Sequence, residues 1–165
     1  MTRIAWLGIA AAAAVAVPTA VVLRADRDPV AIPALAPDVL ATLDGPIRVA
    51  DLVPDAREGH VCHFGPYMDV TLLGPGDLPS PALFDALAPV APVDDATFVL
   101  ALVGPDGMRQ NRLRRRETLD TAHAHHAFED DPICVPGTRA VLRITGHEGR
   151  TYLRLTDADE EGGER

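Results

Sequence analysis

An uncharged apolar run at the start of the chain limits its fold more than any other feature. The run covers residues 4–23, follows Met1-Thr2-Arg3 and ends at Arg24. As a helix, a run of this length spans about 30 Å, the thickness of the hydrocarbon core of a bilayer. The sequence therefore predicts that residues 4–23 enter a membrane or direct the chain across one, and that the remaining residues fold on its far side.

Residues 1–25 fit either a signal anchor or a cleaved signal peptide. The continuation of the run through residues 17–23 favours an anchor, in which Pro18 is tolerated as a kink. Ala14-Val15-Ala16 offers a small-x-small cleavage site after a shorter apolar stretch. A buried helix of a cytosolic protein is the remaining alternative. We expect the N-terminus inside the cell and the domain in the periplasm or outside it, either held in the inner membrane or secreted after cleavage.

Composition excludes several function classes. All basic residues are arginine, and serine occurs once, as Ser80 between two prolines. The chain therefore has no P-loop or Schiff-base lysine and nothing resembling a serine nucleophile elbow. Abundant Ala, Arg, Gly and Pro indicate a GC-rich bacterial genome. Beyond residue 25, thirteen arginines stand against twenty-four acidic residues, and the resulting net charge of −11 argues against nucleic acid as a partner.

Proline, glycine and alternating apolar residues divide the rest of the chain. Residues 26–45 are typical of a Pro-rich tether with a short helix over 37–43. Residues 46–156 are predicted to form a β-rich globular domain. Residues 157–165 are acidic and contain glycine, so we expect a disordered tail.

The predicted domain consists mostly of short strands. A near-continuous apolar run at 97–103 predicts the central strand, and the segment 81–87 has helical spacing. We expect further strands at 46–53, 60–64, 67–73 and 108–116, a loop or a turn of helix at 117–132, and a hairpin around Gly146-His147-Glu148-Gly149. Cys134 lies in a short apolar piece at 133–135. This pattern predicts a mainly β fold, a small antiparallel sandwich or partly open barrel with one or two short helices, preceded by the N-terminal apolar helix. An α+β two-layer domain is the alternative if the helix over 81–87 packs across one face.

Two cysteines, Cys62 and Cys134, are present. In an oxidising compartment, a pair of this kind in a small exported domain is most simply a disulfide. Separate buried thiols and a metal or redox role are the alternatives. The absence of a C-x-x-C motif argues against a thioredoxin-like exchanger.

Histidines form two groups in the sequence, His60 and His63 around Cys62, and His123, His125 and His126 before three acidic residues. These donor types suit Zn or Cu(II), although their spacing matches no closed four-ligand pattern. On a strand, His60 and Cys62 would face one side and His63 the other. A solvated polar loop without metal is the simpler interpretation of the second group, and no cofactor is required by the sequence.

A basic run, Arg112 to Arg116 with Leu113 inside it, is the other candidate site. On a strand, Arg112, Arg114 and Arg116 share one face, and Leu113 and Arg115 share the other. The simpler interpretation is pairing with the many carboxylates of neighbouring strands. The functional interpretation is a contact stripe for an acidic partner or a small anion.

These observations favour a non-enzymatic exported or membrane-anchored envelope domain that contacts another envelope protein. The alternative is an exported transition-metal-binding protein that uses the cluster from His123 to His126. Acid–base catalysis by histidine with a carboxylate is the enzymatic route that the composition leaves open, and no catalytic residue is assigned.

Overall fold

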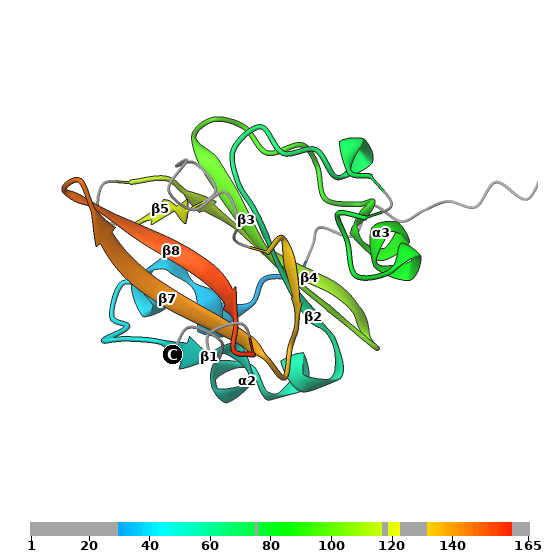
Figure 1. The fold of residues 1–165 in the computed structure, drawn as a ribbon, viewed down its shortest axis with the longest axis horizontal. Coiled ribbons are helices and arrows are strands. Elements are labelled where there is room, and N and C mark those ends of the chain that lie inside the picture. The colour runs from blue at the N-terminus through cyan, green and yellow to red at the C-terminus, as the bar shows by residue number, and fades with distance from the viewer. Residues whose placement is uncertain (1–29, 75, 117–118, 123–131, 160–165) are drawn as a thin grey trace, which may run out of the picture.

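Two four-stranded sheets pack face to face in the computed structural model, which describes residues 30–74, 76–116, 119–122 and 132–159 (Figure 1). The first sheet has the order β4-β3-β2-β6 and is antiparallel throughout. The second has the order β1-β7-β8-β5, in which β5 pairs with β8 in parallel and the other pairs are antiparallel. The fold is therefore mainly β, as predicted, and it does not close into a barrel.

The strands of the described part are β1 (Ile47–Arg48), β2 (His60–Phe64), β3 (Thr97–Gly104), β4 (Gly107–Arg114), β5 (Asp120–Thr121), β6 (Cys134–Pro136), β7 (Ala140–His147) and β8 (Arg150–Asp157). The helices are α1 (Pro37–Leu40), α2 (Val49–Leu52) and α3 (Pro81–Leu87), with 3-10 turns η1 (Pro33–Leu35), η2 (Pro54–Glu58) and η3 (Val70–Leu72). The β7–β8 hairpin confirms the hairpin predicted around residues 146–149, and β3 and β4 form a second hairpin at the predicted strands 97–103 and 108–116. Within these residues no helix is long and apolar enough to cross a membrane, and residues 4–23 lie outside them.

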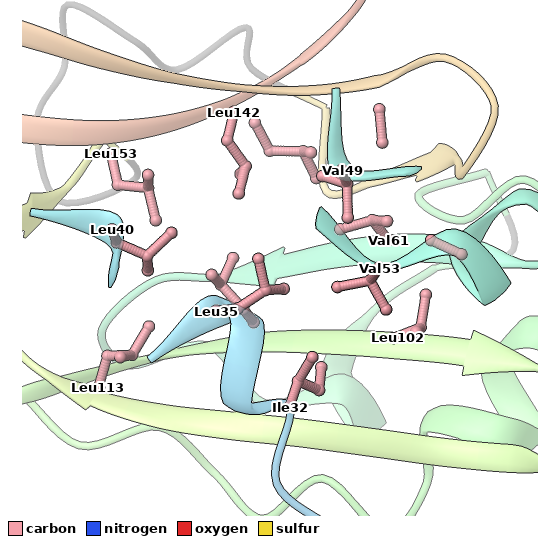
Figure 2. Packing of buried hydrophobic residues seen from close by; sticks show 14 of the residues in the cluster. Ile32, Leu35, Leu40, Val49, Val53, Val61, Leu102, Leu113, Leu142 and Leu153 are labelled. Atoms are coloured by element: carbon pink, nitrogen blue, oxygen red, sulfur yellow. The ribbon is translucent and has the colours of Figure 1, made fainter. Parts of the chain in front are cut away.

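The central strand β3 is buried on both faces because apolar residues continue along its length. Its alternate residues Phe98, Leu100 and Leu102 point towards the second sheet and belong to the same buried core cluster as Leu142, Leu153 and Leu155. Figure 2 shows Leu102 on one side of this core and Leu142 and Leu153 on the other. Val99 and Ala101 point to the outer face and pack with Leu83 and Leu87 of α3. The helix predicted over 81–87 thus covers the outer face of a sandwich. Its N-terminus is capped by Ser80, whose Oγ accepts the Leu83 N–H at 3.3 Å.

The prediction of an extended tether is wrong for the part of residues 26–45 that the structure describes. Ile32, Leu35 and Leu40 are at most 1% exposed and lie between the two sheets (Figure 2). The physical reason is that Pro33 and Pro37 occupy the first positions of η1 and α1, where proline favours a helical turn, instead of extending the chain. Each buried leucine contributes about 1.5–3 kcal/mol, so this segment is part of the domain.

Two predicted strands and one boundary also need correction. The strand over 46–53 ends after Arg48, because Val49, Ala50 and Val53 are buried with helical spacing around α2. The strand over 67–73 is replaced by a turn and η3, which Asp69 caps by accepting the Thr71 N–H at 2.9 Å. Asp157, placed in the tail by the sequence, belongs to β8 and is buried, with an ion pair to Arg139 at 3.1 Å.

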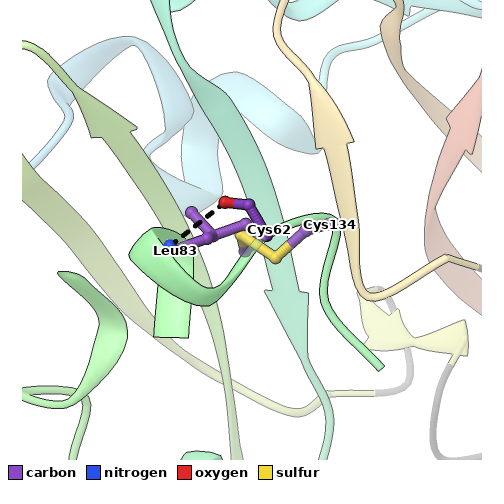
Figure 3. The surroundings of a disulfide bond; sticks show 4 residues. Cys62, Leu83 and Cys134 are labelled. Carbon is purple, nitrogen blue, oxygen red and sulfur yellow. Dashed lines mark hydrogen bonds between the residues drawn. A yellow bond between two sulfur atoms is a disulfide. The ribbon is translucent and has the colours of Figure 1, made fainter. Parts of the chain in front are cut away.

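The predicted disulfide is present. Cys62 and Cys134 are direct partners in the antiparallel register of β2 and β6, and the bond lies beneath Leu83 of α3 (Figure 3). It joins residues 72 positions apart, which in the chain-entropy account contributes roughly 4 kcal/mol. The bond fixes the short edge strand β6 to the sheet. The other edge strand of that sheet is β4, which carries the basic run.

Candidate functional site

The basic run lies at the end of β4, where the chain leaves the first sheet and crosses to β5 of the second. Leu113 points into the core and is 2% exposed, whereas Arg112 and Arg114 are exposed. Arg112, Arg114 and Arg116 line one groove of about 470 Å³, and Leu119, Pro37, Asp38 and Ala41 complete it. The alternation predicted from the sequence therefore brings these three arginines together. We call this feature the arginine groove.

Arg112 is held by the loop that precedes β3. Its guanidinium donates to the backbone oxygen of Ala91 at 3.0 Å and to the Thr97 hydroxyl at 3.3 Å. Asp94 lies close enough for its charge to act on Arg112, and the pKa of Asp94 is lowered first by the hydrogen bond from the Thr97 hydroxyl and then by further contacts that include Arg112. These contacts orient Arg112 without neutralising it by a direct ion pair.

Arg114 and Arg116 likewise form no ion pair with a carboxylate within the part of the chain that the structure describes. Other arginines there do: Arg57 pairs with Asp51 and Arg109 with Asp55. The simpler interpretation of the basic run, cross-strand pairing with carboxylates, therefore does not hold for Arg112, Arg114 and Arg116. Three arginines and Asp38 give the groove a net charge of +2 on a strongly acidic chain.

Arg115 behaves differently because it points to the opposite side of the strand. Its Nε donates to Asp120 at 2.6 Å and its guanidinium NH2 donates to the second carboxylate oxygen at 3.2 Å. Arg150, the first residue of β8, donates to the same carboxylate at 3.0 Å, and the Thr121 N–H donates at 2.8 Å. Asp120 is only 1% exposed. We call the side chains of Asp120, Arg115 and Arg150 the Asp120 cluster.

The Asp120 cluster perturbs both partners. Burial raises the pKa of Asp120, but hydrogen bonds from Arg115, Thr121 and Arg150 together with the charge of Arg115 outweigh burial, so the pKa lies below its ordinary value. The hydrogen bond to Asp120 raises the pKa of Arg115. A second hollow, of about 260 Å³, is lined by this cluster and by Arg116, so it adjoins the arginine groove. The cluster links the end of β4 to β5 and β8, so we assign it a role in stabilising the fold.

Tyr67 is the exposed aromatic residue near this corner. It is 76% exposed, and its charge interaction with Arg115 places the phenol near the Asp120 cluster. Its backbone has a φ of 62°, in the left-handed region that non-glycine residues rarely adopt. Its N–H donates to the Val93 carbonyl at 2.8 Å, which holds the turn in place.

The candidate metal ligands on β2 do not come together. His60 and His63 point to opposite faces of the strand, as predicted, and Cys62 is consumed by the disulfide. His63 is fully buried, where its Nε2 lies 2.7 Å from the Thr121 hydroxyl and its ring packs edge-on against Phe98. Burial lowers the pKa of His60. Among the described residues no three His, Cys, Asp or Glu side chains form a metal-binding group.

His123, His125 and His126 lie outside the described residues, so the role of this cluster stays a prediction. Asp120 was missed by the sequence analysis, which assigned residues 117–132 to a loop. The signal that could have revealed it is the alternation of Leu119 and Thr121 around a charged residue, which is typical of a short strand. No family model, curated protein or solved structure matches the chain.

Proposed function

We propose that this chain is an exported or membrane-anchored, non-enzymatic envelope domain, and that its arginine groove contacts an acidic segment of another envelope protein. The observation that carries the proposal is the lack of carboxylate partners for Arg112, Arg114 and Arg116 in the described part of a chain rich in carboxylates. Guanidinium groups bind carboxylates in a forked geometry, which favours an acidic protein surface as the ligand.

Two further features support an envelope location. The apolar residues 4–23 have the length of a membrane helix, and a disulfide between Cys62 and Cys134 suits an oxidising compartment. The net charge of the chain opposes long-range attraction to nucleic acid and to anionic lipid, so a protein is the favoured partner. The arginine groove would then provide a local patch of the opposite sign that fixes where the partner docks.

Site-specific photo-crosslinking of the full chain in bacterial cells tests this proposal. A photoreactive residue replaces Ala41, an exposed residue that lines the groove, and a matched control carries it at Ala88, the exposed residue directly after the outer helix α3. We expect a crosslinked envelope protein from position 41 and not from position 88. Mass spectrometry should locate the crosslink in an acidic segment of that protein.

The same experiment includes two sets of charge variants. Combined Arg112→Gln, Arg114→Gln and Arg116→Gln substitutions should abolish the crosslink from position 41. Combined Arg48→Gln and Arg57→Gln substitutions, which remove exposed arginines elsewhere, should leave it unchanged. Equal crosslinking from positions 41 and 88, or no effect of the groove substitutions, would contradict the proposal.

A further inference from the structure

The open part of the β4 edge has the features of a site for strand addition. In the first sheet β4 pairs with β3 on one side only. The first half of its free edge is covered by the chain itself: Val30 forms a parallel bridge with Arg109, and the Gln110 N–H donates to the Val30 carbonyl at 3.0 Å. The Asn111 side chain continues this cover by bonding the N–H and carbonyl of Ile32 at 2.8 Å each.

The second half of the edge is open because the chain turns away into α1. In an antiparallel ladder, the backbone groups of successive residues point alternately towards and away from the neighbouring strand. The Gln110 N–H points away from β3, whereas the Arg115 N–H donates to the Ala96 carbonyl on the β3 side at 2.8 Å. By this alternation the backbone N–H and carbonyl groups of Arg112 and Arg114 point outwards, along the arginine groove. Among the described residues, none outside the sheet bonds these backbone groups.

The outward backbone groups of Arg112 and Arg114 and their side chains thus lie along the same groove. The open stretch from Arg112 to Arg114 spans about 7 Å at the rise of an extended strand, enough for some three residues of a peptide. It ends before Arg116, whose N–H donates to the Leu119 carbonyl at 3.0 Å. Arg112 and Arg114 lie on the same face of β4, so a paired strand would place every second side chain beside them. Pro37, Asp38 and Ala41 also line this groove.

We propose that the partner contributes an extended acidic segment that adds as a strand to the open edge of β4, with acidic side chains at alternate positions facing Arg112 and Arg114. This inference rests on the proposed function and specifies its mode of recognition. Backbone hydrogen bonds to the edge provide affinity, and the alternating charges provide specificity. The competing role for arginines on an edge strand is to prevent pairing with other chains, and the test separates the two roles.

Binding of synthetic peptides to the full chain in detergent micelles tests the proposal. The probe is a short peptide with Glu alternating with Thr, and a control peptide has the same composition with its Glu residues grouped together. A third peptide is N-methylated at the alternate amides that would face β4. We expect the grouped and N-methylated peptides to bind about tenfold more weakly, because each lost backbone or charge-assisted bond lowers the affinity.

Hydrogen exchange measured by NMR reports the backbone contact directly. On addition of the alternating peptide, the amides of Arg112 and Arg114 should exchange at least about tenfold more slowly, whereas the already bonded amide of Arg115 should change little. The combined Arg112→Gln and Arg114→Gln substitutions should weaken binding about tenfold. Combined Arg48→Gln and Arg57→Gln substitutions serve as the control.

Each contrary outcome identifies what is wrong. Equal binding of all three peptides, still dependent on the arginines, would overturn strand addition and leave the proposed function standing. No binding, or binding that the arginine substitutions do not weaken, would overturn both and leave the arginines as protection of the edge. Slow exchange at Arg112 and Arg114 before peptide is added, lost when the chain ends at Asp159, would assign the groove to the chain's own acidic C-terminus and overturn the proposal.

Discussion

Arg114 and Arg115 are neighbours in the sequence but belong to two different electrostatic environments. Arg115 lies against a carboxylate that is 1% exposed, and Arg150, beside the turn of the β7–β8 hairpin, binds the same carboxylate. Arg114 lies across the strand, exposed and without an ion pair in the described structure. The alternation of side chains along β4 produces this difference. An arginine that satisfies a buried carboxylate contributes to stability, whereas an exposed arginine that forms no ion pair is available to an external partner.

Removal of the disulfide should have the largest effect on the free energy of unfolding and the smallest effect on the affinity of the arginine groove for a peptide. Replacing Cys62 and Cys134 together by alanine removes a constraint on the unfolded chain, and we expect the free energy of unfolding to fall by about 4 kcal/mol. The measurement is urea unfolding at neutral pH. Since the bond fixes β6, at the opposite edge of the sheet from β4, peptide affinity measured under folding conditions should not change. A tenfold loss of affinity in the folded variant would show that the two edges are coupled.

Removal of the Asp120 carboxylate should have the next largest effect on the free energy of unfolding. Asp120→Asn leaves Arg115 and Arg150 without their buried partner, and we expect a loss of about 3 kcal/mol in the free energy of unfolding. The matched control is Asp85→Asn on the exposed side of α3, which should stay within about 0.5 kcal/mol of the parent. If the two variants lose the same free energy, the Asp120 cluster is not a stabilising element.

Acid should remove the same contribution in the parent chain. The pKa of Asp120 is lowered in the folded state, so its stabilisation is fully present above its unfolded pKa of about 3.9 and is lost as the pH falls through the lower folded value. We expect the stability difference between the parent and Asp120→Asn to narrow below about pH 4. Urea unfolding of both proteins over an acidic pH series measures this, and a constant difference at every pH would argue against it.

Titration of His60 should produce a smaller dependence of the free energy of unfolding on pH, near neutral pH. Burial lowers its pKa, so the unfolded chain binds the proton more readily and stability falls as the pH drops below the unfolded value of about 6.5. His60→Gln should flatten this part of the stability profile. Affinity of the arginine groove for an acidic peptide should stay constant between pH 6 and 8, because arginine remains charged there. A parallel slope in affinity would implicate a titrating group at the groove.

The regular strands and hairpins are the part of the fold that could be predicted from the sequence. The apolar run of β3, the two hairpins and the cysteine pair have local signals, and the structure confirms them. The burial of Ile32 and Leu35 was not predicted, because the prolines around them suggested an extended tether where they open short helices. Alternation also placed Arg112, Arg114 and Arg116 together.

The Asp120 cluster could not be predicted in the same way. Its members come from the residue that follows β4, from β5 and from β8, and Arg150 is thirty residues from Asp120 in the sequence. The parallel pairing of β5 with β8 brings Arg150 to Asp120, and the bridge between Arg116 and Leu119 brings Arg115 to it. Likewise, the lack of an ion pair at Arg114 within the described residues depends on which acidic residues the fold places elsewhere, and no local pattern in the sequence encodes that.

The most direct test of this account compares Arg114→Gln with Arg115→Gln in one experiment that measures both urea unfolding and affinity for the alternating acidic peptide. We predict that Arg114→Gln weakens peptide binding about tenfold and changes the free energy of unfolding by less than about 0.5 kcal/mol. Arg115→Gln should lower the free energy of unfolding by about 2 kcal/mol and leave the affinity of the folded protein unchanged. If both variants lose the same affinity, or if Arg114→Gln destabilises the fold and does not affect binding, the division between a structural and a contacting arginine is wrong.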